Sequence, residues 1–313
     1  MKIVKPSKLN KGDVIGLISP ASTPDDLTRI EKSVKYFESL GYKVKTGKNI
    51  GKYRGYLAGT DEQRVEDLHG MFTDKDVKAI ICLRGGYGSP RLLDKISFKL
   101  IRNNPKIFVG YSDITALQMA FLAKCGLVTF AGPMAAVDFH SNVEPYTEEI
   151  FWAMVTSAKK FGDYRLDPER ETSFYGAKEV QGRVIGGNLA LFCSVAGTPF
   201  MPSLKNKIMM VEDVSEPPYR IDRLLNQLML LKGWDEVQGL ISGVFSDSDE
   251  PDKEKKTLTA EEVFSDYYGQ LNIPYVMNFP HGHIKKNHTI PFGIEVKISP
   301  KKKNIRFLEP AVI

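Results

Sequence analysis

Two predicted strand-to-helix junctions carry the residue types that acyl-transfer chemistry uses. In the first, the apolar run 106–110 leads into Tyr111-Ser112-Asp113 and then into a helical pattern over 114–124. A serine hydroxyl on such a turn lies at the carboxyl edge of a sheet, where helix N–H groups stabilise developing negative charge. The turn is similar to the nucleophile elbow of α/β-hydrolases, but the G-x-S-x-G spacing is absent. On spacing alone, an N-cap role for Ser112 or Asp113 is the simpler explanation.

The second junction is rich in glycine. After the apolar run 79–83 the chain reads Arg84-Gly85-Gly86-Tyr87-Gly88-Ser89-Pro90. Glycines permit positive φ and close backbone approach, which suits an oxyanion hole or a phosphate cradle. The run matches neither the dinucleotide-binding nor the P-loop pattern, which disfavours nucleotide binding and a Rossmann oxidoreductase. A tight turn with Ser89 as N-cap and Pro90 opening a helix is the structural alternative.

Carboxylates follow a third apolar run, 207–211. Glu212 and Asp213 are adjacent, and successive strand side chains point to opposite faces, so the two cannot both face one cleft. Their structural alternative is an acid cluster, with Glu216, at the N-terminus of a helix that begins near Tyr219. Taken alone, this segment favours the structural alternative.

Three of the five histidines, His281, His283 and His288, lie within eight residues. A metal site is disfavoured because no third ligand follows at a typical spacing and Lys285 and Lys286 repel a cation. The other functional interpretation is a general base, and the structural one is a polar loop. Serine, carboxylate and histidine form hydrolytic triads in unrelated chain orders, so the order serine, acid, histidine is permissible here. The residues alone leave it as one option, beside a non-catalytic binding module.

The elements that must position these residues alternate in the first half of the chain. Continuous apolar strands separated by helices predict a parallel sheet covered on both faces, as in Rossmann and flavodoxin-like folds. The predicted strands are 14–18, 42–46, 79–83, 106–110 and 128–130, and the predicted helices begin at Thr23-Pro24, at Thr60 and at Ile114. The glycine loop and the serine turn then lie at neighbouring carboxyl edges, where ligands bind in such sheets.

The second half is mixed and predicts a smaller α/β domain. Its predicted elements are a helix over 188–196 after a Gly186-Gly187 turn, strands 207–211 and 237–245, helices near 221–228 and 259–268, and a hairpin of 295–298 with 305–308. We expect an N-terminal domain over 1–160 with the serine and glycine loops, a connector over 161–178, and a C-terminal domain over 179–313 with Glu212 and His283.

Composition excludes several classes of protein. The chain has 313 residues, a net charge of +5, 42% hydrophobic and 26% charged residues, which is typical of a globular protein and too mild a charge for a nucleic-acid binder. Three scattered cysteines predict neither a disulfide framework nor a zinc site. The uncharged run 184–204 contains glycines and prolines that favour a buried strand, turn and helix over a membrane span. We predict a cytoplasmic protein with no cofactor, metal, nucleic-acid or membrane partner.

Taken in order, the motifs resemble the LD-carboxypeptidase family of serine peptidases, which includes muramoyl-tetrapeptide carboxypeptidase and the microcin C self-immunity hydrolase. Each motif is weak alone, but the ordered set extends from about Gly16 to Gly293. The matching motifs are Ile18-Ser19-Pro20-Ala21-Ser22, Arg84-Gly85-Gly86-Tyr87-Gly88, Gly110-Tyr111-Ser112-Asp113, Gly186-Gly187-Asn188-Leu189, Val211-Glu212-Asp213-Val214 with Pro218-Tyr219-Arg220-Ile221-Asp222-Arg223, and Gly282-His283.

The resemblance implies a role for each of these residues. Ser112 is the nucleophile, His283 the general base, and Glu212 the residue that orients the base. The backbone amides of Gly86 and Asp113 form the oxyanion hole.

The resemblance also implies a substrate. The family releases a C-terminal D-amino acid, here D-alanine, from an L-centre of a cytoplasmic murein tetrapeptide, and its members form homodimers. Arg84 is a candidate clamp for the free carboxylate, with a salt bridge that holds its loop as the alternative. The alternative substrate is an aminoacyl-nucleotide antibiotic, as in the microcin immunity branch. The chain departs from the family at His281, where a larger apolar residue is usual, while His283 keeps the Gly-His match.

Overall fold

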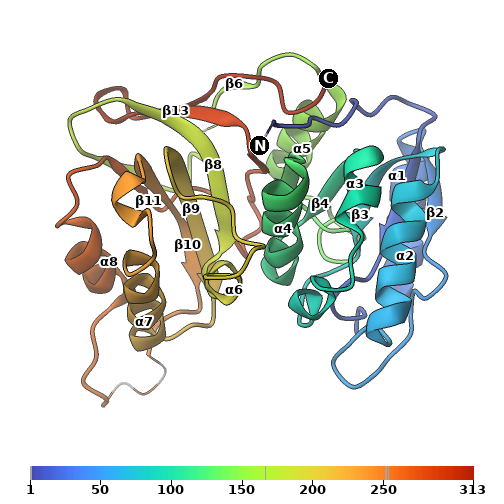
Figure 1. Cartoon of the computed structure of the whole chain (residues 1–313), viewed down its shortest axis with the longest axis horizontal. Helices are drawn as coiled ribbons and strands as arrows, with labels where there is room; N and C mark the ends of the chain where they lie inside the picture. The colour runs from blue at the N-terminus through green and yellow to red at the C-terminus, as the bar shows by residue number, and fades with distance from the viewer. Residues whose placement is uncertain (1, 166, 251, 253) are drawn as a thin grey trace.

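The computed structural model describes residues 2–165, 167–250, 252 and 254–313. In this part of the chain the strands form two sheets, which lie beside one another in Figure 1. Helix α4, Thr115–Cys125, lies between them and contacts strand β8, Val180–Asn188, of the second sheet. The two α/β halves therefore meet along α4.

The first sheet confirms the predicted flavodoxin-like arrangement. Its strand order is β12-β5-β4-β3-β1-β2, and β2, β1, β3, β4 and β5 are parallel. The central strands are buried because their apolar residues are continuous and both faces are covered. One strand from the far end of the chain, β12, adds to β5 in antiparallel direction. The bounds are β1 Val14–Ile18, β2 Lys43–Thr46, β3 Val77–Cys82, β4 Ile107–Gly110, β5 Thr129–Ala131 and β12 Ile290–Phe292.

Five helices accompany this sheet in the described residues: α1 Thr28–Ser39, α2 Asp61–Thr73, α3 Phe98–Asn103, α4, and α5 Pro145–Thr156. Thr60 caps α2 in a capping box with Gln63. The predicted start of α1 at Thr23-Pro24 is wrong, because the Thr23 hydroxyl donates to the carbonyl of Lys52 instead. The Asp26 carboxylate accepts the N–H of Thr28 at 2.9 Å, and α1 begins there.

The second sheet has the order β6-β14-β13-β8-β9-β10-β11-β7, and β8 to β11 form its parallel centre. The predicted hairpin is confirmed as β13 and β14. The bounds are β6 Gly162–Asp163, β7 Ser173–Tyr175, β9 Lys207–Val214, β10 Gly239–Ser246, β11 Tyr275–Met277, β13 Glu295–Ser299 and β14 Asn304–Phe307, with helices α6 Leu189–Ser194, α7 Pro218–Met229 and α8 Ala260–Tyr268.

Gly186 and Gly187 do not form the predicted turn. Both continue strand β8, with φ of 126° and 120°. A Cβ at Gly186 would lie 1.8 Å from the carbonyl oxygen of Met210 in β9, so glycine is needed for close approach of two strands rather than for chain reversal.

The predicted domain limits can be compared with the sheets. Residues 161–178, of which residue 166 lies outside the described part, contribute β6 and β7 to the second sheet. Residues 290–292 belong to the first sheet, although they lie in the predicted C-terminal domain. The chain thus passes between the two halves more than once. Among its described helices, none is long and apolar enough to cross a membrane.

Candidate active site

Ser112 lies on a strained turn at the carboxyl end of β4. The strand ends at Gly110, a 3-10 turn covers Ser112–Ile114, and α4 follows directly. Ser112 has a φ of 61°, in the left-handed region that non-glycine residues rarely adopt. Such strain is typical of functional turns. Nucleophile elbows have the same strain, so the turn shares this property with them although it lacks the G-x-S-x-G spacing. The half-buried Ser112 side chain therefore stands at the meeting line of the two halves.

The glycine loop packs directly against this serine. A Cβ at Gly85 would lie 2.8 Å from the Cβ and 3.0 Å from the Oγ of Ser112, and 3.3 Å from the amide nitrogen of Asp113. Only glycine leaves room there for the serine side chain. Within the part of the chain that the structure describes, no hydrogen bond uses the N–H of Gly86 or Asp113. Among the described residues, neither N–H therefore has a competing hydrogen-bond partner, as an oxyanion hole would require.

Glu212 and His283 form a hydrogen-bonded pair. The Oε2 atom of Glu212 lies 2.9 Å from Nδ1 of His283, and Glu212 is 0% exposed. Gly243 and Gly282 enclose the carboxylate, since a Cβ on Gly282 would lie 3.1 Å from Oε2. Burial opposes the charged imidazole, but the hydrogen bond and charge of Glu212 outweigh it and raise the pKa of His283 above its ordinary value. The imidazole is thereby oriented and made more basic.

Asp213 points away from this pair, as the alternation of the strand predicts. Its carboxylate accepts hydrogen bonds from the Asn188 side chain at 2.7 Å and from the Ala190 N–H at 2.9 Å. It therefore binds the start of α6, and the prediction that it supports the helix beginning near Tyr219 is wrong, because that helix lies after a further turn. Glu216 does contact that helix, through Arg220 at 3.5 Å.

The structure distinguishes His281 from His283. His281 is 0% exposed, its Nδ1 bonds the carbonyl of His288 at 2.8 Å, and burial lowers its pKa. His283 keeps part of its side chain exposed at the site. A proton acceptor for an incoming substrate needs such access, so the geometry favours His283.

The three segments converge where the two sheets meet. The ring of Tyr111, the neighbour of Ser112, lies edge-on to the imidazole of His283, with 5.1 Å between centroids. The Thr115 hydroxyl at the start of α4 accepts the N–H of Asn188 at 3.0 Å and ties the serine turn to β8. The serine turn of the first sheet thus lies beside the Glu212–His283 pair of the second.

The contacts of Arg84 do not join it to Ser112, Glu212 or His283. Its guanidinium lies 3.0 Å from the exposed carboxylate of Asp25 and also contacts the carbonyl of Thr23. These contacts are those of the salt-bridge alternative. A role for Arg84 in holding a substrate carboxylate stays a prediction.

Two carboxylates near the site make contacts that the sequence did not predict. Asp138 accepts the N–H of Met134 at 2.7 Å, burial raises its pKa to about 6, and its charge also favours protonated His283. The Asp113 side chain accepts the N–H of Ser89 at 2.7 Å, and the Ser89 hydroxyl donates to the Asp113 carbonyl. The N-cap role predicted for Ser89 is therefore wrong, and the cap position belongs to Gly88.

The arrangement can carry out nucleophilic acyl transfer. It combines a strained serine, a histidine with a buried carboxylate partner, and two backbone N–H groups that have no hydrogen bond within the described part of the chain. Among the described residues, no group of three or more His, Cys, Asp or Glu side chains is arranged to hold a metal ion.

Comparison with known proteins agrees with this class of site. Residues 15–132 match the LD-carboxypeptidase N-terminal domain and residues 181–298 the LD-carboxypeptidase C-terminal domain. The chain therefore belongs to the LD-carboxypeptidase family of peptidases.

Three relatives illustrate the range of this family. A protein of Bacillus subtilis named "Probable murein peptide carboxypeptidase" is 38% identical over 96% of this chain and 92% of its own. The microcin C7 self-immunity protein MccF of Escherichia coli is 31% identical over 95% and 94%. A structure of MccF with glutamyl sulfamoyl guanosine has a TM-score of 0.90 at 29% identity over 99% of both chains. The muramoyltetrapeptide carboxypeptidase from Oxalobacter formigenes has a TM-score of 0.80 at 30% identity over 94% and 97%.

Proposed function

We propose that this protein is a serine LD-carboxypeptidase that releases D-alanine from the C-terminus of a murein tetrapeptide during peptidoglycan recycling in the cytoplasm. The observation that carries the proposal is the buried Glu212–His283 pair near a strained Ser112, together with two amides that have no hydrogen bond among the described residues. The family and its murein-directed members supply the substrate class.

The proposed mechanism follows from this geometry. His283 removes the proton of the Ser112 hydroxyl, and the serine oxygen attacks the carbonyl carbon of the last peptide bond. The N–H groups of Gly86 and Asp113 hold the oxyanion, each donor being worth about 3 kcal/mol in such sites. The Glu212 carboxylate stabilises the imidazolium that forms. His283 then protonates the leaving amine of D-alanine, and water hydrolyses the acyl-enzyme.

The test uses two synthetic tetrapeptides, L-Ala-D-Glu-diaminopimelate-D-Ala and L-Ala-D-Glu-L-Lys-D-Ala. Incubation with the wild-type protein should release free D-alanine, measured by mass spectrometry. Ser112→Ala should release none while it unfolds at the same temperature as the wild type. If the wild type releases no D-alanine from either peptide, murein recycling is wrong as the primary role. If Ser112→Ala keeps the wild-type rate of D-alanine release, Ser112 is not the nucleophile and the serine mechanism is wrong. If the wild type binds the peptides but cleaves neither, a non-catalytic binding module is favoured.

The likeness to MccF favours a second candidate, the hydrolysis of an aminoacyl-nucleotide antibiotic. The serine would attack the acyl carbonyl, with the same histidine as base and the same amides holding the oxyanion. The nucleotide part would leave with a proton from His283, and water would then release the amino acid from the acyl-enzyme. Glutamyl sulfamoyl adenosine is a suitable probe, with release of glutamate as the readout. A kcat/KM for this probe above that for both tetrapeptides would reverse the order of the two candidates.

Homodimer formation is part of the proposal, since it is implied only by the resemblance. Sedimentation or light scattering at several protein concentrations tests it. A monomer at all concentrations would remove the dimer and leave the proposed chemistry unchanged, because every residue that the mechanism uses lies on one chain.

A further inference from the structure

Arg64 is a buried cation close to the glycine loop. It lies in the first turn of α2 and is 1% exposed. Its Nη1 donates to the carbonyls of Pro20 at 2.8 Å and Gly88 at 2.9 Å, and its Nη2 donates to Asp61 Oδ1 at 2.6 Å. A buried charge is costly unless its partners are well placed, so these two carbonyls are specific partners of the guanidinium.

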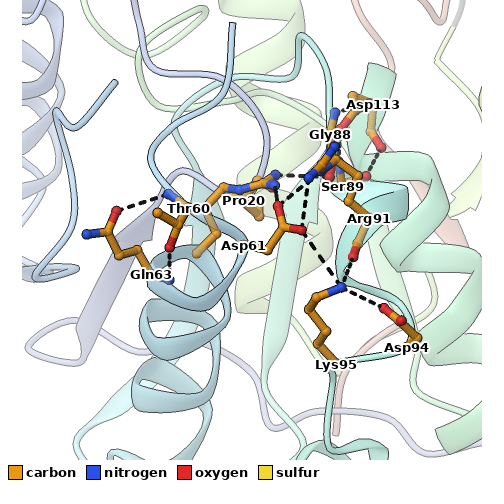
Figure 2. A network of polar contacts seen from close by, with 11 residues as sticks. Pro20, Thr60, Asp61, Gln63, Gly88, Ser89, Arg91, Asp94, Lys95 and Asp113 are labelled. Atoms are coloured by element: carbon orange, nitrogen blue, oxygen red, sulfur yellow. Dashed lines mark hydrogen bonds and ion pairs between the residues drawn. The ribbon is translucent and has the colours of Figure 1, made fainter. Parts of the chain in front are cut away.

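The peptide of Gly88 lies between opposite charges. The C=O of Gly88 accepts from Arg64 at 2.9 Å, and the N–H of the same peptide group, which belongs to Ser89, donates to Asp113 Oδ2 at 2.7 Å. Figure 2 shows the carboxylate of Asp113 beside Gly88 and Ser89, and Asp61 on the side of α2. Hydrogen bonds to charged partners are roughly twice as strong as neutral ones. The pair of charges therefore fixes the orientation of this peptide along one direction.

The second carbonyl bound by Arg64 extends its hold to the start of the loop. Pro20 lies in the segment after β1, and in this segment Ser22 donates its N–H to the Gly85 carbonyl at 3.2 Å. The Ser22 hydroxyl also accepts the N–H of Tyr87 at 3.1 Å. Arg64 thus secures the loop at Gly88 directly, and at Gly85 and Tyr87 through the segment of Pro20.

Gly86 lies inside this frame. Its φ is 104°, and a Cβ at this position would lie 2.4 Å from the Ser22 hydroxyl, so the loop rests closely on the Ser22 segment. Since its own N–H has no bond within the described residues, its direction is set by the neighbouring peptides that Arg64, Asp113 and Ser22 hold.

We propose that Arg64 is a positioning residue for the oxyanion hole, which holds the N–H of Gly86 toward the carbonyl attacked by Ser112. The inference rests on the proposed function and adds a residue that touches no substrate. Arginine suits the task because its rigid planar fork reaches two carbonyls and a carboxylate at once, whereas a lysine ammonium is a single point charge. Loss of the fork should therefore affect the transition state more than substrate binding.

Arg91 provides a matched control. It binds the same carboxylate, with its Nε 3.1 Å from Asp61 Oδ1, and its side chain is partly exposed. Within the described residues, the hydrogen bonds of the Arg91 side chain reach neither Pro20 nor Gly88; its backbone N–H does bond the Gly88 carbonyl, at 3.2 Å, but a side-chain substitution keeps that N–H. An ionic network that serves stability alone would respond to Arg91 and Arg64 in the same way.

The experiment compares Arg64→Lys, Arg64→Met and Arg91→Gln in the full chain. Steady-state kinetics of D-alanine release give kcat and KM, and hydrogen exchange by mass spectrometry follows peptides that cover residues 85–89. We expect both Arg64 variants to lose about 100-fold in kcat, as removal of one oxyanion donor does, with KM within about 3-fold. Their residues 85–89 should exchange faster. Arg91→Gln should stay within about 3-fold of wild type in kcat.

Two results would overturn the inference: Arg64→Lys folds and keeps kcat within about 3-fold, or the loss appears in KM alone. If Arg64→Met does not fold, Arg64→Lys decides, since it keeps the charge. If the wild type releases no D-alanine, the proposed function fails, and hydrogen exchange alone decides whether Arg64 holds the loop. Unchanged exchange at 85–89 in Arg64→Lys then refutes the hold as well.

Discussion

Replacing Glu212 by glutamine removes one charge from the centre of the candidate site and leaves its shape almost unchanged. Glu212 is fully buried and lies 2.9 Å from the His283 imidazole, and Gly243 and Gly282 enclose it. Glutamine is isosteric, so it should occupy the same space. The amide can donate to Nδ1, however, which would place the proton on Nε2 and leave no acceptor for the Ser112 proton.

The size of the effect follows from the charge pair. A carboxylate and an imidazolium whose charge centres are about 4 Å apart attract by about 4 kcal/mol at an effective dielectric constant near 20. Each ~1.4 kcal/mol corresponds to a factor of ten in rate, so the lost stabilisation of the imidazolium predicts a fall of about 10³ in kcat. The pKa of His283 should fall in the same variant, because Glu212 is what raises it.

The assay is D-alanine release from the murein tetrapeptide, with kcat and KM measured separately between pH 5 and 9. Glu216→Gln is the control, since Glu216 lies on the following turn and contacts Arg220 instead of the histidine. It should keep nearly full activity. The reasoning is refuted if Glu212→Gln folds and retains more than about a tenth of the wild-type kcat, or if its pH profile is unchanged.

Three further predictions test the serine turn and its base. Gly85→Ala should reduce kcat by at least about 100-fold, because the new methyl would meet the Ser112 side chain at 2.8 Å; near-normal turnover would contradict this contact. Ser112→Gly should be about 1 kcal/mol more stable to urea than Ser112→Ala, because only glycine adopts a φ of 61° without strain. The opposite order would argue against strain at this turn. Finally, kcat/KM should rise with pH to a plateau, with a midpoint above pH 6.5, because His283 acts unprotonated and its pKa is raised. A midpoint below pH 6.5 would contradict the assigned Glu212–His283 pair.

The sequence was a good guide to the first sheet because its signals are local. Continuous apolar runs mark β1, β3 and β4, and the loops that follow them carry the serines and glycines of the site. Parallel strands bring their carboxyl ends to one edge, so these loops had to be neighbours. Strand β12 could not be predicted as part of this sheet, since its pairing with β5 is set by packing between distant segments.

The candidate site was predictable in part for the same reason. Alternation along β9 shows that Glu212 and Asp213 face opposite sides, but the side that meets the histidine depends on how the sheet packs. Arg64 follows Asp61, Glu62 and Gln63 in a polar helical segment, which is typical of an exposed face. Its burial arises because the glycine loop and the segment after β1 fold over it, which no periodicity records.

The chain segment that contains His283 continues directly into strand β12, which completes the first sheet. His283 lies between β11 of the second sheet and β12 of the first, so one short stretch of chain delivers the base and then closes the outer edge of β5. A fragment that stops before this stretch would leave the hydrogen-bonding groups of β5 open to other chains. During synthesis, the first sheet, which carries the serine, therefore lacks its outer strand until the last tenth or so of the polypeptide has been made. A C-terminal fragment that complements such a truncated chain would have to supply both His283 and strand β12.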